Sequence, residues 1–188
     1  MNRSLPFVIA LMVVACACGG GGGGGGVVDP SPTPLTASFV AAQPSPGANT
    51  VSMASGGGTD DIVAVRVDVT GTSDVWGAAF DVQFNPVYID YVGYTPGTLL
   101  EQGGQTVSYT VRPPTGSSGI VVVGVSRVGQ APAVDVTTTR TLVNLTFRVK
   151  SKGSYPLDFG PGASLLDASV ASISGLVEPW SGGSLQGN

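Results

Sequence analysis

Apolar and polar residues alternate with a period of two over most of the chain from residue 38 onward. This is the side-chain repeat of a strand with one buried face. Valine, leucine or phenylalanine takes every second position most clearly in 63–70, 78–84 and 143–149. Weaker strand candidates are 51–53, 89–94, 106–112, 155–159, 165–169 and a last segment at Ser184 and Leu185. Turn signals such as the glycine-rich 56–60 separate these segments, and convincing amphipathic helices are missing. The pattern therefore predicts an all-β sandwich.

The segment 120–127 departs from this alternation, because apolar residues occupy both parities in its first half. A strand of this kind is either covered on both faces or leaves one apolar face for a partner. The segment is therefore a candidate for a binding surface, and its pattern alone leaves both readings open.

The first fifteen residues have the features of an export signal. Arg3 supplies a basic start, and 5–15 is an apolar stretch too short to span a bilayer. The stretch ends in Val-Val-Ala followed by Cys16, which resembles the lipobox of bacterial lipoproteins, where the cysteine is acylated and becomes the mature N-terminus. We expect residues 1–15 to be a signal peptide and Cys16 to be lipidated. Cys18 is the alternative acylation site, and an ordinary signal peptide with incidental cysteines is the alternative reading.

Residues 16–37 are expected to form a lipidated tether. The run 19–26 consists of glycine alone and is followed by a proline-rich stretch, a composition typical of flexible chain passing into extended chain. One acyl chain binds membranes only marginally, so several are required for attachment. We expect an exported lipoprotein, anchored through N-terminal acyl chains in the bacterial cell envelope at the outer membrane or cell surface, with a folded domain over 38–188.

Composition excludes several classes of function. The formal net charge is -4 and no run of lysine or arginine is present, so nucleic acid is not an expected partner. Histidine is absent, and Glu101 and Glu178 are the only glutamates. Asp68 and Asp81 are expected on solvated outer strand faces, where nothing in the sequence indicates desolvation. We therefore expect no enzyme activity and no cofactor.

A metal site is not expected either. Asp60, Asp61 and Asp74 lie in predicted loops and could offer oxygen ligands to calcium, but their spacing matches no metal-binding motif. Solvated loop acids are the preferred interpretation.

Three segments carry a resemblance to a known family. The run 76–86, Trp-Gly-Ala-Ala-Phe-Asp-Val-Gln-Phe-Asn-Pro, resembles the third-strand region of cohesin modules, which ends in an aromatic residue, Asp or Asn, and Pro. The segment 89–100 is similar to the cohesin short strand and Pro-Gly turn, and 141–157 resembles a late strand with its hairpin. The three occur in the cohesin order, and we take the resemblance to extend over most of 38–186. The resemblance implies a nine-stranded jelly-roll β-sandwich.

The resemblance also implies a function. Cohesins bind dockerin modules through the exposed face of one sheet, so we expect a non-catalytic cell-surface module for dockerin-bearing proteins linked to polysaccharide degradation. Small Ala79 and Gly124 depart from the polar or bulkier groups common in the family. For Asp81, Gln83 and Arg127, the alternative interpretation is a solvated polar face that binds no partner. The candidate partner-binding residues are Ala79, Asp81, Gln83, Val122, Gly124, Ser126 and Arg127.

Two other functions remain open. Related carbohydrate-binding modules share the jelly-roll architecture, and Trp76 and Trp180 are possible glycan contacts, whereas Phe80, Phe84 and Phe147 are expected to face inward. A structural envelope lipoprotein that assembles through sheet edges is the third hypothesis.

Overall fold

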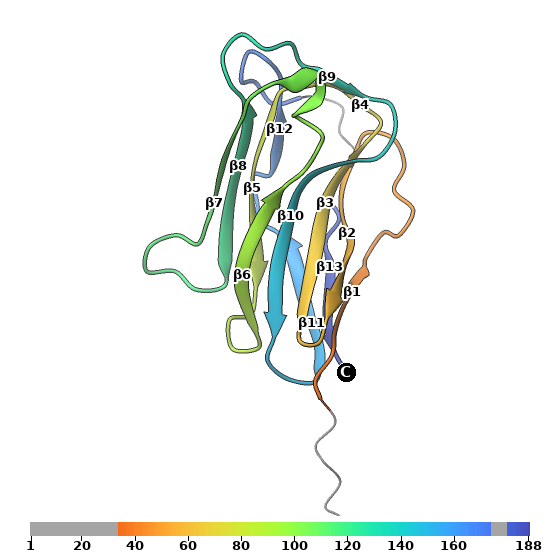
Figure 1. The fold of residues 1–188 in the computed structure, drawn as a ribbon, viewed down its shortest axis with the longest axis vertical. Coiled ribbons are helices and arrows are strands. Elements are labelled where there is room, and N and C mark those ends of the chain that lie inside the picture. The colour runs from red at the N-terminus through yellow and green to blue at the C-terminus, as the bar shows by residue number, and fades with distance from the viewer. Residues whose placement is uncertain (1–33, 174–179) are drawn as a thin grey trace, which may run out of the picture. The chain divides into compact units, whose positions relative to one another are not determined.

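A computed structural model describes residues 34–173 and 180–188, and these residues form an antiparallel β-sandwich (Figure 1). The predicted signal peptide, Cys16, Cys18, the tether as far as residue 33, and Glu178 lie outside the described residues. The strands are β1 (Ala37–Ala41), β2 (Thr50–Thr59), β3 (Ile62–Thr70), β4 (Thr72–Val75), β5 (Gly77–Phe84), β6 (Ile89–Pro96), β7 (Val107–Arg112), β8 (Ile120–Arg127), β9 (Val134–Val136), β10 (Arg140–Val149), β11 (Gly153–Phe159), β12 (Ser164–Leu166) and β13 (Gly183–Gly187).

Two sheets form the layers of the sandwich. The first, sheet A, has the order β1-β13-β11-β5-β8-β7, with β12 also pairing with β5, and the second, sheet B, has the order β2-β3-β10-β6. The short strands β4 and β9 pair with each other. The predicted all-β sandwich is confirmed. The count of nine was approximate, because the described residues form thirteen strands: β12 adds to sheet A, and β4 and β9 form a separate pair outside the two main layers.

The core between the sheets follows the alternation in the sequence. On β3 every second side chain is a fully buried valine. Phe147 on β10 is fully buried, and the rings of Phe84 and Tyr91 pack against it edge to face at 5.6 and 5.9 Å. The described residues include no helix long and apolar enough to cross a membrane.

Two of the expected segment limits are wrong. The glycines of 56–60 belong to strand β2 rather than to a turn, and the register of β2 against β3 shifts between Ser55 and Gly58. Gly57 supports this irregularity with a φ of 91°, which a residue with a side chain rarely adopts. The strand expected over 165–169 ends at Leu166, because the Asp167 carboxylate accepts backbone N–H groups from Ser169 and Ala171 and closes a turn.

The two sheets meet differently at their two sides. At one side Ser181 bonds with β2, accepting from the Met53 N–H at 2.8 Å and donating to the Val51 carbonyl at 3.0 Å. At the other side the end strands β6 and β7 bring Tyr94 and Tyr109 together with ring centroids 6.0 Å apart. The Tyr109 hydroxyl donates to the Gly97 carbonyl at 3.2 Å. One side is thus closed by backbone hydrogen bonds and the other by aromatic side chains.

Candidate partner-binding face

The outer surface of strands β5, β8 and β7 carries most of the predicted binding residues. These strands lie side by side in sheet A (Figure 1). On β8 the odd-numbered valines from 121 to 125 are buried, so the other parity faces outward. The structure thereby decides between the two readings of 120–127, since one face is core and the other is exposed. The outward side chains of the two central strands are Ala79, Asp81, Gln83, Val122, Gly124 and Ser126.

The pairing register arranges these side chains in rows across three strands. The central row consists of Ala79, Gly124 and Thr110, paired from β5 through β8 to β7. The next row contains Asp81, Val122 and Arg112. Because the central row carries only small side chains, a partner can approach the sheet backbone closely there. We call this surface the β5–β8–β7 face.

Charge is sparse on the β5–β8–β7 face and differs between its two sides. Asp81 lies on β5, and Gln83 beside it pairs with Asp158 of β11. Arg112 lies on β7 at the other side, with Val122 between it and Asp81. Val122 is 37% exposed, which makes it an apolar contact point among polar groups. The arrangement of a small apolar centre with polar margins is typical of protein interfaces.

The prediction that Arg127 belongs to the outward set is wrong. Arg127 is only 3% exposed, because it lies at the parity of the buried valines of β8. Its Nε donates to the Leu100 carbonyl at 2.9 Å, its Nη2 donates to the Gln102 carbonyl at 2.6 Å, and its Nη1 donates to the Pro132 carbonyl. Burial lowers the pKa of this guanidinium. Arg127 therefore joins two loops inside the fold instead of meeting a partner.

The two tryptophans do not form an exposed glycan platform. Trp180 is 6% exposed and packs against Phe80 and Phe159, with ring centroids 5.5 and 5.1 Å apart, so its ring is buried and does not serve as the possible glycan contact. Trp76 is half-buried just before β5, where its backbone bonds to Leu166 and Arg127. Phe80 and Phe147 are buried and Phe84 is half-buried, as expected.

Sequence reasoning missed the contribution of β7 to the face. Ser108, Thr110 and Arg112 pair with the outward residues of β8 and are exposed. The segment 106–112 was predicted as a strand, and its alternation of valine or tyrosine with serine, threonine or arginine marks the outward parity. The missing information was the pairing partner, which a sequence pattern does not specify. Ser164 of β12 joins the same face beside Ala79.

The acidic residues also differ from expectation. Asp68 points to the outer side of sheet B but is 3% exposed, so the expectation of a solvated side chain is wrong. Its Oδ1 accepts a hydrogen bond from the Thr141 hydroxyl at 2.7 Å, and its Oδ2 lies 3.3 Å from Nη2 of Arg66. Among residues 34–173 and 180–188, no three histidine, cysteine or acidic side chains converge as metal ligands.

The fold and the exposed sheet face together define a β-sandwich binding module. A family model described as the cohesin domain matches residues 48–178, which is more than half of the chain. The chain belongs to the cohesin family. No curated protein sequence matches it.

Solved cohesin structures share this fold at low sequence identity. The sixth cohesin of scaffoldin B from Acetivibrio cellulolyticus, solved with a Cel5 dockerin mutant, has a TM-score of 0.55 at 17% identity, covering 72% of this chain and 96% of that one. A type II cohesin-X-dockerin complex from the same organism has a TM-score of 0.55 at 15% identity, covering 67% and 91%. Type II cohesin A11 from Bacteroides cellulosolvens has a TM-score of 0.52 at 19% identity, covering 66% and 91%.

Proposed function

We propose that this chain is a binding module that captures dockerin-bearing proteins on the β5–β8–β7 face. Cohesin domains are non-catalytic binding modules, and two of the similar structures are complexes with dockerins. The observation that carries the proposal is the flat row of Ala79, Gly124 and Thr110 at the centre of an exposed sheet. It offers a partner a close approach to backbone without a bulky side chain in the way.

The chemistry of the face specifies the partner's complementary surface. An apolar side chain of the partner can pack on Val122, and the row of small residues can accommodate a ridge. A basic or hydrogen-bond donor group fits beside Asp81 and Asp158, whereas an acidic group fits beside Arg112. Such complementary charges act mainly on orientation and specificity. Close packing at the centre contributes the larger part of the affinity.

The matched variants Gly124→Gln and Gly93→Gln test this face. A Cβ at Gly124 would meet only the Thr110 Cβ at 3.8 Å, and a Cβ at Gly93 on β6 would meet nothing within 4 Å. Neither glycine has a positive φ, so both variants are expected to fold. Gly124→Gln places a long side chain on the central row of the β5–β8–β7 face, while Gly93→Gln places the same side chain on sheet B.

The experiment uses the chain with Cys16→Ser, which removes the expected acylation site, immobilised and exposed to lysate and culture fluid of the source organism. Mass spectrometry identifies the retained proteins, and calorimetry then measures the affinity of a recovered dockerin. We expect Gly124→Gln to weaken binding at least about tenfold, which is about 1.4 kcal/mol. Gly93→Gln is expected to bind like the parent chain. Failure to retain any dockerin-bearing protein, or equal affinity of the two variants, would contradict the proposal.

We also propose that the chain is anchored in the bacterial envelope through acylated Cys16. The support is the apolar stretch ending in Val-Val-Ala before that cysteine. Metabolic labelling with an alkyne fatty acid tests the site. Label is expected on the parent chain and on Cys18→Ser, and it should be absent from Cys16→Ser. Label that survives Cys16→Ser would assign the lipid to another residue and refute this part of the proposal.

A further inference from the structure

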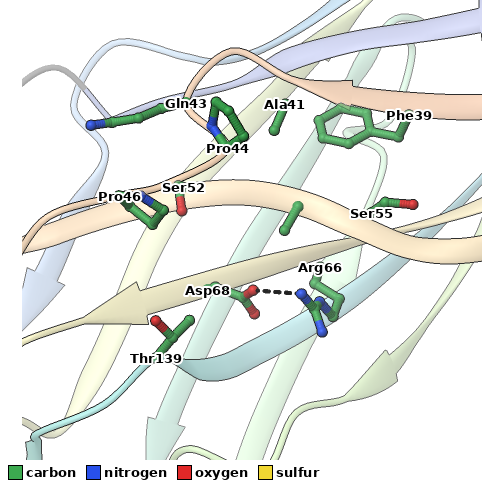
Figure 2. A pocket seen from close by; sticks show the side chains of 11 residues that line it. Phe39, Ala41, Gln43, Pro44, Pro46, Ser52, Ser55, Arg66, Asp68 and Thr139 are labelled. Carbon is green, nitrogen blue, oxygen red and sulfur yellow. Dashed lines mark ion pairs between the residues drawn. The ribbon is translucent and has the colours of Figure 1, made fainter.

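A groove of about 350 Å³ lies on the outer side of sheet B, away from the strands of the β5–β8–β7 face (Figure 2). One wall comes from β1 and the connection that follows it, and the floor comes from β2 and β3. We call this cavity the β2–β3 groove. Its volume is at the lower end of the range for small-molecule sites. Its lining includes Phe39, Pro44, Pro46, Ser52, Ala54, Arg66 and Asp68.

The floor of the groove carries a carboxylate with unused hydrogen-bonding capacity. The Asp68 side chain is 4% exposed, and only the Thr141 hydroxyl and the Arg66 guanidinium contact its oxygens as described above. A carboxylate has about four lone-pair sites, so acceptor capacity remains. Ser52 is the cross-strand neighbour of Asp68 in the pairing of β2 with β3, and it lines the same cavity.

Arg66 supplies the donors of the same site. Its side chain is 43% exposed, so part of the guanidinium is open to a ligand. Its Nε is buried without a hydrogen-bond partner, which leaves the contact between Arg66 and Asp68 one-sided. A buried unpaired N–H is costly. A ligand that draws the guanidinium toward the groove would provide new acceptors for Arg66.

The opposite wall is stiff and mostly apolar, with Gln43 as its one polar side chain. Phe39, Pro44 and Pro46 line it, and the proline rings restrict the backbone that carries them (Figure 2). Phe39 is 7% exposed, so it closes the wall without presenting an aromatic platform. The groove therefore places an apolar surface opposite a pair of polar side chains.

Side chains rather than backbone groups must recognise the occupant. The β2 backbone groups that could pair with an added peptide strand at this level, at Val51 and Met53, already bond to Ser181. A net charge on the ligand is also disfavoured, because Arg66 and Asp68 neutralise each other. Arg66 would repel a cationic ligand, and Asp68 would repel an anionic one. Hydroxyl groups fit this pair, since each can donate to Asp68 and accept from Arg66, while C–H faces pack on proline.

We propose that the β2–β3 groove binds one or two units of a neutral saccharide. This site is separate from the proposed dockerin function in residues and in sheet. Amide-resolved NMR titration of the full chain with cellotetraose, xylotetraose and mannotetraose tests it. We expect shifts confined to groove residues such as Ser52, Ala54 and Arg66 with at least one sugar, and smaller shifts with tetragalacturonic acid, whose carboxylates face Asp68.

Arg66→Gln and Arg148→Gln form the matched pair of variants. Arg148 contacts Asp61 at 3.2 Å on the same sheet and is similarly exposed, but it does not line the groove. Ala54→Phe is a second groove variant that fills the floor and leaves the ion pair in place. We expect saccharide binding to fall at least about tenfold in Arg66→Gln and in Ala54→Phe and to persist in Arg148→Gln. Dockerin capture should be unchanged in all three.

The proposal is overturned if no neutral saccharide shifts groove amides, or if tetragalacturonic acid shifts them more strongly than every neutral sugar. It is also overturned if Ala54→Phe retains full binding in the folded state. A proline-rich peptide that shifts the groove amides when the sugars do not would assign the cavity to a peptide instead. The dockerin test with Gly124→Gln concerns only the proposed function of the β5–β8–β7 face. Its outcome, positive or negative, does not change how the saccharide experiment is interpreted.

Discussion

Replacing Arg127 by methionine tests how the interior of this sandwich holds its loops. The Arg127 guanidinium is buried and donates to carbonyls of Leu100, Gln102 and Pro132, which lie in two separate connections. Methionine retains an unbranched apolar stem in place of the arginine stem but has no hydrogen-bond donor. Arg127→Met therefore leaves three carbonyls near the core without their partner.

The cost can be estimated from these contacts. A hydrogen bond from a charged donor contributes about 1.5 kcal/mol or more, so three such bonds contribute about 5 kcal/mol. Removing the buried charge returns part of its desolvation penalty, and we take about 2 kcal/mol of that gain. The free energy of unfolding is therefore expected to fall by about 3 kcal/mol.

Urea unfolding followed by tryptophan fluorescence measures this loss. With a slope of about 2 kcal/mol per molar urea, the midpoint should fall by about 1.5 M. Arg140→Met is the control, because Arg140 is exposed at the start of β10, and its effect should stay within about 0.5 kcal/mol. If both variants unfold at the same urea concentration, the buried guanidinium does not stabilise the loops and the reasoning is refuted.

Two further substitutions and one pH titration test the packing seen in the same structure. Phe147→Ala should lower the free energy of unfolding by about 3–5 kcal/mol in urea melts, because the ring is fully buried, and a smaller loss would mean that the core collapses around it. Gly97→Ala should cost about 1–3 kcal/mol by the same assay, since its Cβ would overlap the Thr141 carbonyl; parent-like stability would contradict that crowding. Burial raises the pKa of Tyr91 and of Tyr109 to about 12, so stability should decline as the pH rises from 10 to 12, and absorbance titration showing both ionising near 10 would disprove it.

The strands could be predicted from sequence because alternation reports directly on burial. The valines of β3 alternate with polar residues, and the structure buries each of those valines. The alternation on β5 identified Ala79 as an outward residue, whereas Gly124 was placed outward by the resemblance to cohesins, and the register now places the two side by side. A period-two pattern shows which side of a strand faces the core, and that was sufficient for the β5 part of the candidate face.

The errors concern residues whose burial depends on distant segments. Arg127 is polar at an inward parity, and only the carbonyls of loops far along the chain explain why it is tolerated there. Asp68 has the outward parity, yet it shares a groove with prolines of the connection after β1. Trp180 packs on Phe80 and Phe159 from other strands. The alternation of residues along one strand carries no information about such tertiary neighbours.

The pairing of β1 has a mechanical consequence. β1 runs antiparallel to β13 from Ala37 opposite Gly187 to Ala41 opposite Gly183, and Thr36 and Asn188 extend the ladder with bonds of 2.9 and 3.3 Å. A pull along β1 applied at its N-terminal end loads these pairs in shear, all at once, instead of unzipping them one by one. β13 passes the load to β11 and β11 passes it to β5. Tension between the start of the domain and a partner held on β5 is thus carried through one continuous set of backbone ladders.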